Sequence, residues 1–215
     1  MGLPPAPLDA SLLTAASPWN IPVQVMTETT SSNDEVLRLG ENGAPTGTLL
    51  FTERQTAGRG QFRRPWASSQ PLGLWFSLLL RLKINDATIP ALSAFAAVAL
   101  VETLESLGLP DARIKEPNDI YLQVRKVAGI LVETRMGKSP FAVVGIGLNV
   151  NQRLGDFPEE LQSIATSLSI FSGKTFDRES VAKSLLGVLG RSEHLMHDDP
   201  AALIARWNSL LLPAS

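Results

Sequence analysis

Residues 126–150 read KVAGILVETRMGKSPFAVVGIGLNV, two apolar runs joined by a short polar link. The runs at Lys126–Arg135 and Phe141–Ile146 are rich in aliphatic residues and are interpreted as strands. The link at Met136–Pro140 is short enough for a hairpin, in which neighbouring strands are antiparallel. This stretch therefore predicts an antiparallel strand pair in the middle of a β-sheet.

The predicted sheet extends on the N-terminal side of this pair. The short link Val124-Arg125 predicts another hairpin, and the near-continuous apolar run at Gly73–Leu82 indicates a buried strand. Further strands are predicted, in chain order, at Val23–Glu28, Gly47–Glu53, Ala112–Lys115 and Ile120–Gln123.

Helical patterns flank these strands. Ile89–Leu107 is apolar all round and ends at Gly108, which indicates a central buried helix. Ser32-Asn33-Asp34-Glu35 fits the capping box S-x-x-E and predicts a short helix that ends at Gly40. The last third of the chain is predicted to be helical at Glu179–His197 and Ala201–Leu212.

We therefore expect an α+β fold in which helices cover one face of a mixed, largely antiparallel sheet. Residues 1–20 are rich in Pro and Ala and lack periodicity, so we expect a loosely ordered arm there. Residues 21–215 are expected to form one domain, because 215 residues suit one domain better than two.

Composition excludes several kinds of chemistry. The chain has no cysteine, which excludes thiol catalysis, disulfides and cysteine-based zinc sites. Its net charge is −2 and its pI about 5.7, so no global basic field indicates nucleic-acid binding. The sequence has neither a secretory signal nor an uninterrupted apolar run of about 18 residues, so we expect a cytoplasmic protein outside any membrane.

The long segment Arg54–Leu72, which lacks apolar periodicity, is the first candidate site. Its part Arg54–Trp66 contains four arginines and no acid, and Gly58 and Gly60 let the backbone approach a ligand. Arginine is a planar donor that suits carboxylate and phosphate groups. The pattern fits an anion-binding loop or a solvated basic loop whose glycines only form turns. If it is an anion-binding loop, we expect it to be mobile without a ligand and to become ordered over a bound anion, since it has little else to pack on.

Two further segments carry candidate groups. Lys126 begins an apolar strand, where its ammonium would lie at the edge of the core and attract an anion strongly. A lysine that protects an edge strand from aggregation is an equally good explanation. Gly129 leaves room for a flat ligand, and the glycines of Gly145–Asn149 let a ligand approach the backbone.

Five motifs occur in one order along the chain: Ser31-Ser32-Asn33, Gly58-Arg59-Gly60 with Trp66, Lys115-x-Pro117-Asn118-Asp119, Lys126-x-x-Gly129-Ile130-Leu131-x-Glu133 and Gly145-Ile146-Gly147-Leu148-Asn149-Val150. As a set they resemble the catalytic domain of biotin–protein ligases, over residues 22–212. The resemblance implies the fold that these ligases share with class II aminoacyl-tRNA synthetases.

The resemblance also implies a reaction in two steps. Biotin and ATP, with Mg²⁺, give biotinoyl-5′-adenylate and pyrophosphate. A specific lysine of a biotin carboxyl carrier protein, a subunit of acetyl-CoA carboxylase, then takes the biotinoyl group. No side chain of the enzyme becomes covalently attached, and no metal site made by the protein alone is implied.

The resemblance assigns roles to individual residues. Lys126 and Arg59 match catalytic positions, where positive charge faces the reacting carboxylate and phosphate. The residues that match the biotin pocket are Ser31, Ser32, Asn33, Gln55, Gly58, Arg59, Gly60, Gln61, Lys126 and Gly129. Those that match the ATP and adenylate site are Arg64, Trp66, Lys115, Asn118, Asp119 and Asn149.

The sequence departs from the family pattern in three respects. The family loop often reads G-R-G-R-x-G-R-x-W, but Gln61 and Arg63 stand here in place of an arginine and a glycine. Glu116 stands where tryptophan is common, which removes an aromatic wall. The expected domain has no DNA-binding or C-terminal β-barrel part, so we expect no DNA partner. We also expect either a monomer or a homodimer.

Two alternatives remain open on the sequence. A lipoate–protein ligase or octanoyltransferase would share the fold, but the signature Arg-Arg-x-x-Gly-Gly-Gly is absent and the cysteine-dependent enzymes are excluded. A non-catalytic biotin-binding relative is the other alternative. Biotin-dependent exchange between ATP and pyrophosphate distinguishes a ligase from such a binding module.

Overall fold

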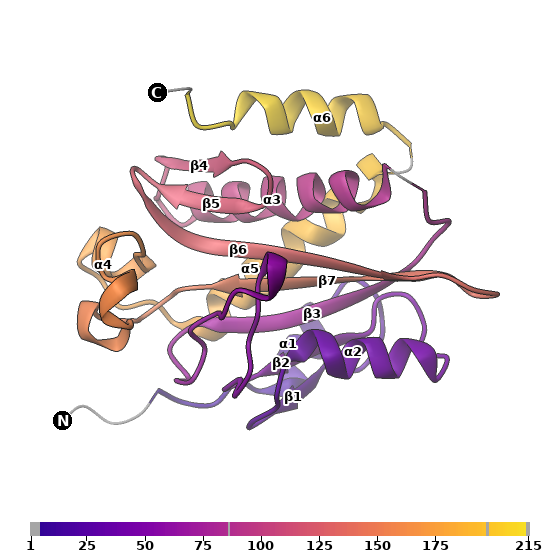
Figure 1. The fold of residues 1–215 in the computed structure, drawn as a ribbon, viewed down its shortest axis with the longest axis horizontal. Helices are drawn as coiled ribbons and strands as arrows, with labels where there is room; N and C mark the ends of the chain where they lie inside the picture. The colour runs from indigo at the N-terminus through magenta and orange to yellow at the C-terminus, as the bar shows by residue number, and fades with distance from the viewer. Residues whose placement is uncertain (1–4, 86, 197, 214–215) are drawn as a thin grey trace.

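The computed structural model describes residues 5–85, 87–196 and 198–213, and within these residues a seven-stranded sheet has the order β1-β2-β3-β7-β6-β5-β4 (Figure 1). β1 pairs with β2 in parallel, and every other neighbouring pair among the described strands is antiparallel. The prediction of a mixed, largely antiparallel sheet is confirmed. The strands are β1 (Gln24–Met26), β2 (Leu49–Thr52), β3 (Leu74–Arg81), β4 (Ala112–Lys115), β5 (Asp119–Leu122), β6 (Arg125–Arg135) and β7 (Phe141–Leu148).

The longest helix of the described residues, α3, is the central core helix that the sequence predicted. It packs against β4 and β6 of the sheet and against α5 and α6. By length and composition α3 could cross a membrane, but 72% of its most apolar window is buried in this fold. The helices are α1 (Ala10–Ala16), α2 (Ser32–Glu41), α3 (Thr88–Ser106), α4 (Leu168–Ser172), α5 (Arg178–Ser192) and α6 (Pro200–Ser209).

The expectation that helices cover only one face of the sheet is wrong. Side chains of a strand alternate between faces, so Leu49 and Phe51 of β2 join the large core around α3. Leu50 lies between them in sequence and contributes to a second cluster on the other face. In that cluster Val36 and Leu37 of α2 are buried against the sheet. Helices therefore cover both faces, and α2 covers only part of its face.

The start and end of α2 differ from the predicted capping box. Ser31, not Ser32, is the N-cap, and no side chain caps the helix there. Gly40 lies inside the helix, where a β-carbon would collide with Phe141 of β7. Arg81 binds the end of the helix, because its guanidinium donates to the carbonyl of Gly40 at 2.8 Å. Gly40 thus permits close packing on the sheet rather than ending the helix.

The N-terminal segment is more ordered than the sequence suggested. It contains α1, whose N-cap Asp9 accepts hydrogen bonds from two backbone N–H groups and whose Leu13 is fully buried. The predicted helix at Glu179–His197 ends earlier, at Ser192, and a 3₁₀ turn, Glu193–Met196, follows it. His197 lies outside the described residues.

A buried ion pair joins four parts of the chain. The guanidinium of Arg178, at the start of α5, lies 2.8 Å from the carboxylate of Glu53, and both side chains are over 90% buried. The same guanidinium donates to the carbonyls of Gly73 and Ala6, and Glu53 accepts the backbone N–H of Leu8. The pair therefore connects the N-terminal segment, the end of β2, the start of β3 and α5.

Replacing Arg178 with methionine should lower the free energy of unfolding by about 3–5 kcal/mol, because a buried carboxylate loses its counter-charge. Urea denaturation measures this loss. Arg206→Met is the matched control, since Arg206 pairs with Glu102 and Glu105 at the surface and its loss should cost at most about 1 kcal/mol. Adding Glu53→Gln to Arg178→Met should restore much of the stability. Equal losses in the two single variants would contradict this account.

Candidate active site

Small residues hollow out the face of the sheet that carries α2. Gly129 of β6 pairs with Gly147 of β7, and Ser77 of β3 pairs with Gly145 of β7. Further along the same face, larger side chains pack against α2, as the second hydrophobic cluster shows. A cleft of about 790 Å³ opens over the small residues, a volume in the usual range for small-molecule sites, about 300–1,000 Å³.

Trp66 lies over this glycine floor. A β-carbon added to Gly147 would come within 2.6 Å of the indole, and one added to Gly129 within 2.9 Å. The ammonium of Lys126 lies 5.1 Å from the centre of the ring, a distance at which a cation is attracted by the aromatic face. The loop Arg54–Leu72 therefore does have a surface to pack on, contrary to the expectation from its sequence.

Backbone hydrogen bonds shape the loop further. The N–H of Gln55 donates to the carbonyl of Ser68 at 2.8 Å, and the N–H of Trp66 donates to the carbonyl of Gly58 at 2.8 Å. Between these residues a 3₁₀ turn spans Gln61–Arg63. Arg63 has a φ of 56°, a left-handed conformation that glycine adopts at lower cost. This geometry gives a physical reason for the glycine that the family pattern has at position 63.

Three of the polar residues expected to hold biotin, Ser31, Ser32 and Gln55, lie together in the lining of the cleft. Gln55 accepts the backbone N–H of Ser32 at 2.8 Å, and its amide nitrogen donates to the hydroxyl of Ser68 at 3.1 Å. Ser31 is buried and is the N-cap residue of α2. Its hydroxyl nevertheless makes no hydrogen bond to any of the described residues. Ser31 thus leaves a donor and an acceptor at the cleft.

Asn33 reaches across the floor and joins the sheet. Its amide oxygen accepts from the hydroxyl of Ser77 at 2.6 Å, and its amide nitrogen donates to the carboxylate of Glu133 at 2.8 Å. A β-carbon on Gly145 would collide with this side chain. Asn33 is therefore part of the buried support of the cleft and also orients Glu133.

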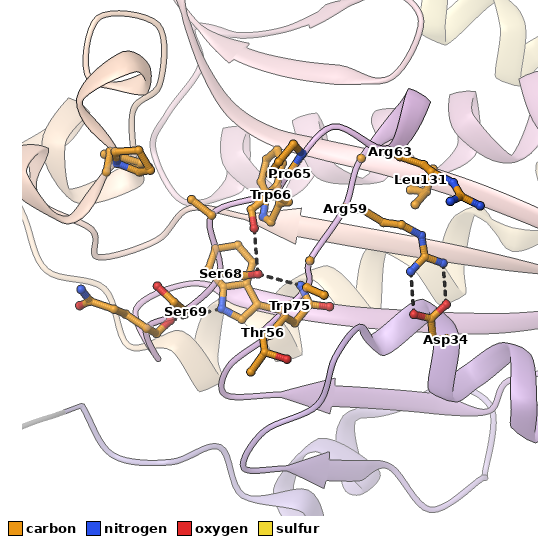
Figure 2. Close-up of a pocket in the computed structure, with 18 of the residues that line it drawn as sticks. Asp34, Thr56, Arg59, Arg63, Pro65, Trp66, Ser68, Ser69, Trp75 and Leu131 are labelled. Carbon is orange, nitrogen blue, oxygen red and sulfur yellow. Dashed lines mark hydrogen bonds and ion pairs between the residues drawn. The ribbon is translucent and has the colours of Figure 1, made fainter.

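Arg59 is held by two carboxylates, those of Asp34 (Figure 2) and Glu133. Its guanidinium makes two hydrogen bonds of 2.7 Å to Asp34 and a third, of 2.9 Å, to Glu133. The hydrogen bonds to Asp34 raise the pKa of Arg59 above its ordinary value, partial burial opposes this rise, and the charge of Glu133 adds to it. Arg59 lines the cleft as expected, but both acids were missing from the predicted site.

Lys126 is fixed by its backbone and by its side chain. Its N–H donates to the carbonyl of Ile164, and its carbonyl accepts from the N–H of Thr166, both at 2.8 Å. Its ammonium lies 2.7 Å from the carboxylate of Asp119, and both side chains are about a quarter to a third exposed. A cation is therefore held above the glycine floor with little freedom to move.

The other residues expected at the adenylate site divide into two groups. Asn118 and Asn149 are buried, and their amides donate to main-chain carbonyls of Ile130 and Thr166 at 2.6 Å and 2.9 Å. Lys115 and Arg64 are exposed instead, with Lys115 4.9 Å from the ring of Tyr121. The asparagines thus support the walls, and the two basic residues line the opening of the cleft.

A second cavity of about 1230 Å³ adjoins the first (Figure 2). Arg59 and Trp66 line both cavities, while Asp34, Glu133 and Gln152 line the second alone. Gln152 is buried, and its amide oxygen has no hydrogen-bond partner in the described part of the chain. The two cavities therefore meet at Arg59 and Trp66.

Gly147→Ala should displace the indole of Trp66, because the new methyl group would lie 2.6 Å from it. We expect faster trypsin cleavage at the arginines of the loop, with little change in cleavage elsewhere. Gly155→Ala is the matched control, since a β-carbon there meets nothing within 4 Å. Cleavage of the loop at the wild-type rate in a folded Gly147→Ala protein would show that Trp66 does not hold the loop.

Comparison with known proteins places this site in a family context. A model of the Biotin/lipoate A/B protein ligase family matches residues 23–151. The bifunctional ligase/repressor BirA of Bacillus subtilis is 43% identical over 150 residues, which are 69% of this chain and 46% of that protein. The biotin–[acetyl-CoA-carboxylase] ligase of Mycobacterium tuberculosis is 36% identical over 182 residues, 81% of this chain and 65% of that protein.

Solved structures agree with these matches. The biotin protein ligase of Aquifex aeolicus in complex with biotin and ATP has a TM-score of 0.76 at 33% identity, covering 88% of this chain and 78% of that one. The ligase of Leishmania major with biotinyl-5-AMP shares the fold, with a TM-score of 0.71 at 21% identity over 88% of this chain and 81% of that one. The chain spans about half the length of the BirA relatives it matches. On the match of residues 23–151, together with these likenesses, the chain belongs to the biotin/lipoate A/B protein ligase family, as its motifs indicated.

Proposed function

We propose that this chain is an ATP-dependent biotin–protein ligase. The observation that supports it most is that one cleft unites a polar end at Ser31 and Gln55, a glycine floor and a fixed lysine, Lys126. The relative from Aquifex aeolicus binds biotin and ATP, and the relative from Mycobacterium tuberculosis is a biotin–[acetyl-CoA-carboxylase] ligase.

The polar end of the cleft suits the ureido ring of biotin. That ring offers two N–H donors and one carbonyl acceptor, and buried polar groups of a ligand require partners. The hydroxyl of Ser31 can donate or accept, and Ser32 and Gln55 lie beside it. The apolar bicycle and chain of biotin can then lie in the cleft beside the indole of Trp66, towards Lys126.

In the first proposed step, a carboxylate oxygen of biotin attacks the α-phosphorus of ATP. The bond from that phosphorus to the bridging oxygen breaks, and pyrophosphate leaves with the electron pair. Negative charge on the transferring group is stabilised by a cation that is already in place. Lys126 fits this role because Asp119 and the backbone contacts at Ile164 and Thr166 fix it. Mg²⁺ would arrive with ATP and be bound largely by its phosphates.

In the second proposed step, the ε-amino group of the carrier lysine attacks the carbonyl carbon of the mixed anhydride. The carbon–oxygen bond to the phosphate breaks, AMP leaves, and the amine loses a proton as the amide forms. No covalent bond to the enzyme is needed, so positioning and charge supply the catalysis. The proposed partner is the biotin carboxyl carrier protein of acetyl-CoA carboxylase, in line with the name of the Mycobacterium tuberculosis relative.

The polar end of the cleft favours biotin over lipoate. Lipoate ends in a dithiolane ring without hydrogen-bonding N–H or carbonyl groups, so it would leave Ser31 and Gln55 without a ligand partner. A non-catalytic biotin-binding relative would bind biotin without catalysing exchange. The cytoplasmic location, the absence of DNA binding and the monomeric or homodimeric state stay predictions.

A direct test incubates the protein with biotin, Mg-ATP and a carrier domain, and measures the mass of the carrier. We expect a gain of one biotinoyl group on one lysine, together with ATP–pyrophosphate exchange that requires biotin. Exchange driven by lipoate or octanoate and not by biotin would favour the acyl-ligase alternative. Biotin binding without exchange would favour the binding module.

Lys126→Ala should retain biotin binding and reduce adenylate formation about a hundredfold or more, because a donor to the developing charge is worth about 3 kcal/mol. Single-turnover formation of biotinoyl-adenylate measures the effect, and isothermal titration measures biotin binding. Lys183→Ala is the control, since that lysine pairs with Glu179 on α5. Wild-type adenylate formation in Lys126→Ala would remove Lys126 from the mechanism.

Gln61→Arg should reduce the escape of biotinoyl-adenylate from the cleft that Gln61 lines. A charge-assisted hydrogen bond to the phosphate is roughly twice as strong as a neutral one. Escape is measured as biotin incorporation into albumin, an unrelated acceptor. Gln123→Arg makes the same change in the exposed link between β5 and β6 and serves as the control. Equally low labelling of albumin by the wild type, Gln61→Arg and Gln123→Arg would mean that Arg63 or Arg64 already holds the biotinoyl-adenylate.

A further inference from the structure

Arg59 and the two carboxylates bound to it carry a net charge of −1. Asp34 binds both Nη atoms of Arg59 in a bidentate pair (Figure 2), and Glu133 also accepts a hydrogen bond from Nη2. An anion that approaches this arginine therefore meets two carboxylates already bound to it. An anion can bind the fork formed by the two Nη atoms of Arg59 only if Asp34 leaves it.

The two carboxylates differ in how firmly they are held. Glu133 belongs to β6, its side chain is 26% exposed, and Asn33 donates to the same oxygen that binds Arg59. Asp34 lies in the first turn of α2, and its side chain is 49% exposed. If Asp34 turns to solvent, water and the N-terminal end of α2 still stabilise its charge. If Glu133 left instead, it would lose the largely buried Arg59, and the amide nitrogen of Asn33 would keep only its longer hydrogen bond, of 3.3 Å, to the carbonyl of Leu131.

We propose that Asp34 is a specificity-determining residue that occupies the anion position on Arg59 and is displaced by the anionic group of the reactants. Glu133 remains bound and keeps the guanidinium oriented. The inference rests on the proposed function for the identity of the ligand. The incoming group is the carboxylate of biotin or the α-phosphate of the adenylate, both of which match the planar fork of arginine.

This exchange has a consequence for selectivity. An anionic ligand replaces the carboxylate of Asp34 with its own negative group, so Arg59 keeps its charge partners. A neutral ligand offers no such replacement and must leave the Arg59–Asp34 pair closed beside it. Asp34 thus lowers the affinity for every anionic ligand that binds Arg59 by the same factor. It does not change the affinity for neutral ligands.

Asp34→Asn tests the inference, because it removes the competing charge and keeps the shape of the side chain. Isothermal titration is made with three probes: biotin, the neutral biotinamide, and biotinol-5′-AMP, an unreactive ester with a phosphate and no carboxylate. For the anionic probe whose charged group displaces Asp34, biotin or biotinol-5′-AMP, we expect the Kd of Asp34→Asn to be about fivefold lower than that of the wild type. This factor is in line with the modest strength of half-exposed ion pairs. The Kd of biotinamide should not change, which a merely structural role of Asp34 would not explain.

Two further variants act as controls. Glu35→Gln makes the same charge change in the same turn of α2, where Glu35 pairs with Arg38 rather than Arg59, and should alter no Kd. In the background of Arg59→Gln, Asp34→Asn should lose its effect, as expected for two residues that act through one contact. Thermal unfolding of each variant checks that the fold is retained.

The outcomes separate the inference from the proposed function. Tighter binding of biotin identifies the carboxylate as the displacing group, and tighter binding of biotinol-5′-AMP alone identifies the phosphate. Unchanged or weaker binding of both anionic probes to Asp34→Asn, in a protein whose wild type binds biotin, overturns the inference alone. A wild-type protein that binds none of the three probes overturns the proposed function and this inference with it.

Discussion

The site depends on the alternation of side chains along β3, β6 and β7. One face of these strands carries Ser77, Gly129, Gly145 and Gly147 next to one another, and the opposite face carries the apolar core beneath α3. Because the strands cannot shift by one residue without exposing that core, the small residues are kept on the outer face. The hollow that results accepts the indole of Trp66 and leaves a cleft beside it.

The two cations expected to be catalytic, Lys126 and Arg59, are held in ion pairs. Lys126 is held by Asp119, and Arg59 by Asp34 and Glu133. Such pairing keeps the charged side chains in defined positions, which is the requirement for electrostatic catalysis without a covalent intermediate. It also means that affinity for an anion is set by competition with the protein's own carboxylates. The four arginines of the loop are therefore a poor measure of how strongly it attracts a ligand.

The sequence predicted the strands from Ala112 onwards to within about two residues of their bounds, because hairpin links and apolar runs are local signals. It missed α1 and α4, which are short helices without a clear amphipathic pattern. It also placed the helices on one face, since local patterns do not say which side of a sheet a short helix covers. Among site residues, Lys126, Gly129 and Gln55 were found from motifs and line the cleft.

By itself, the sequence determined the strand pattern, the order of the motifs and the family, because these depend on residues close together in the chain. Only the tertiary structure decided the partners of the charged groups. Arg59 is 25 positions from Asp34 and 74 from Glu133, and both contacts exist because the fold brings the loop between the start of α2 and β6, which Asn33 joins. Ion pairs between distant segments depend on how those segments pack, and no local pattern records that.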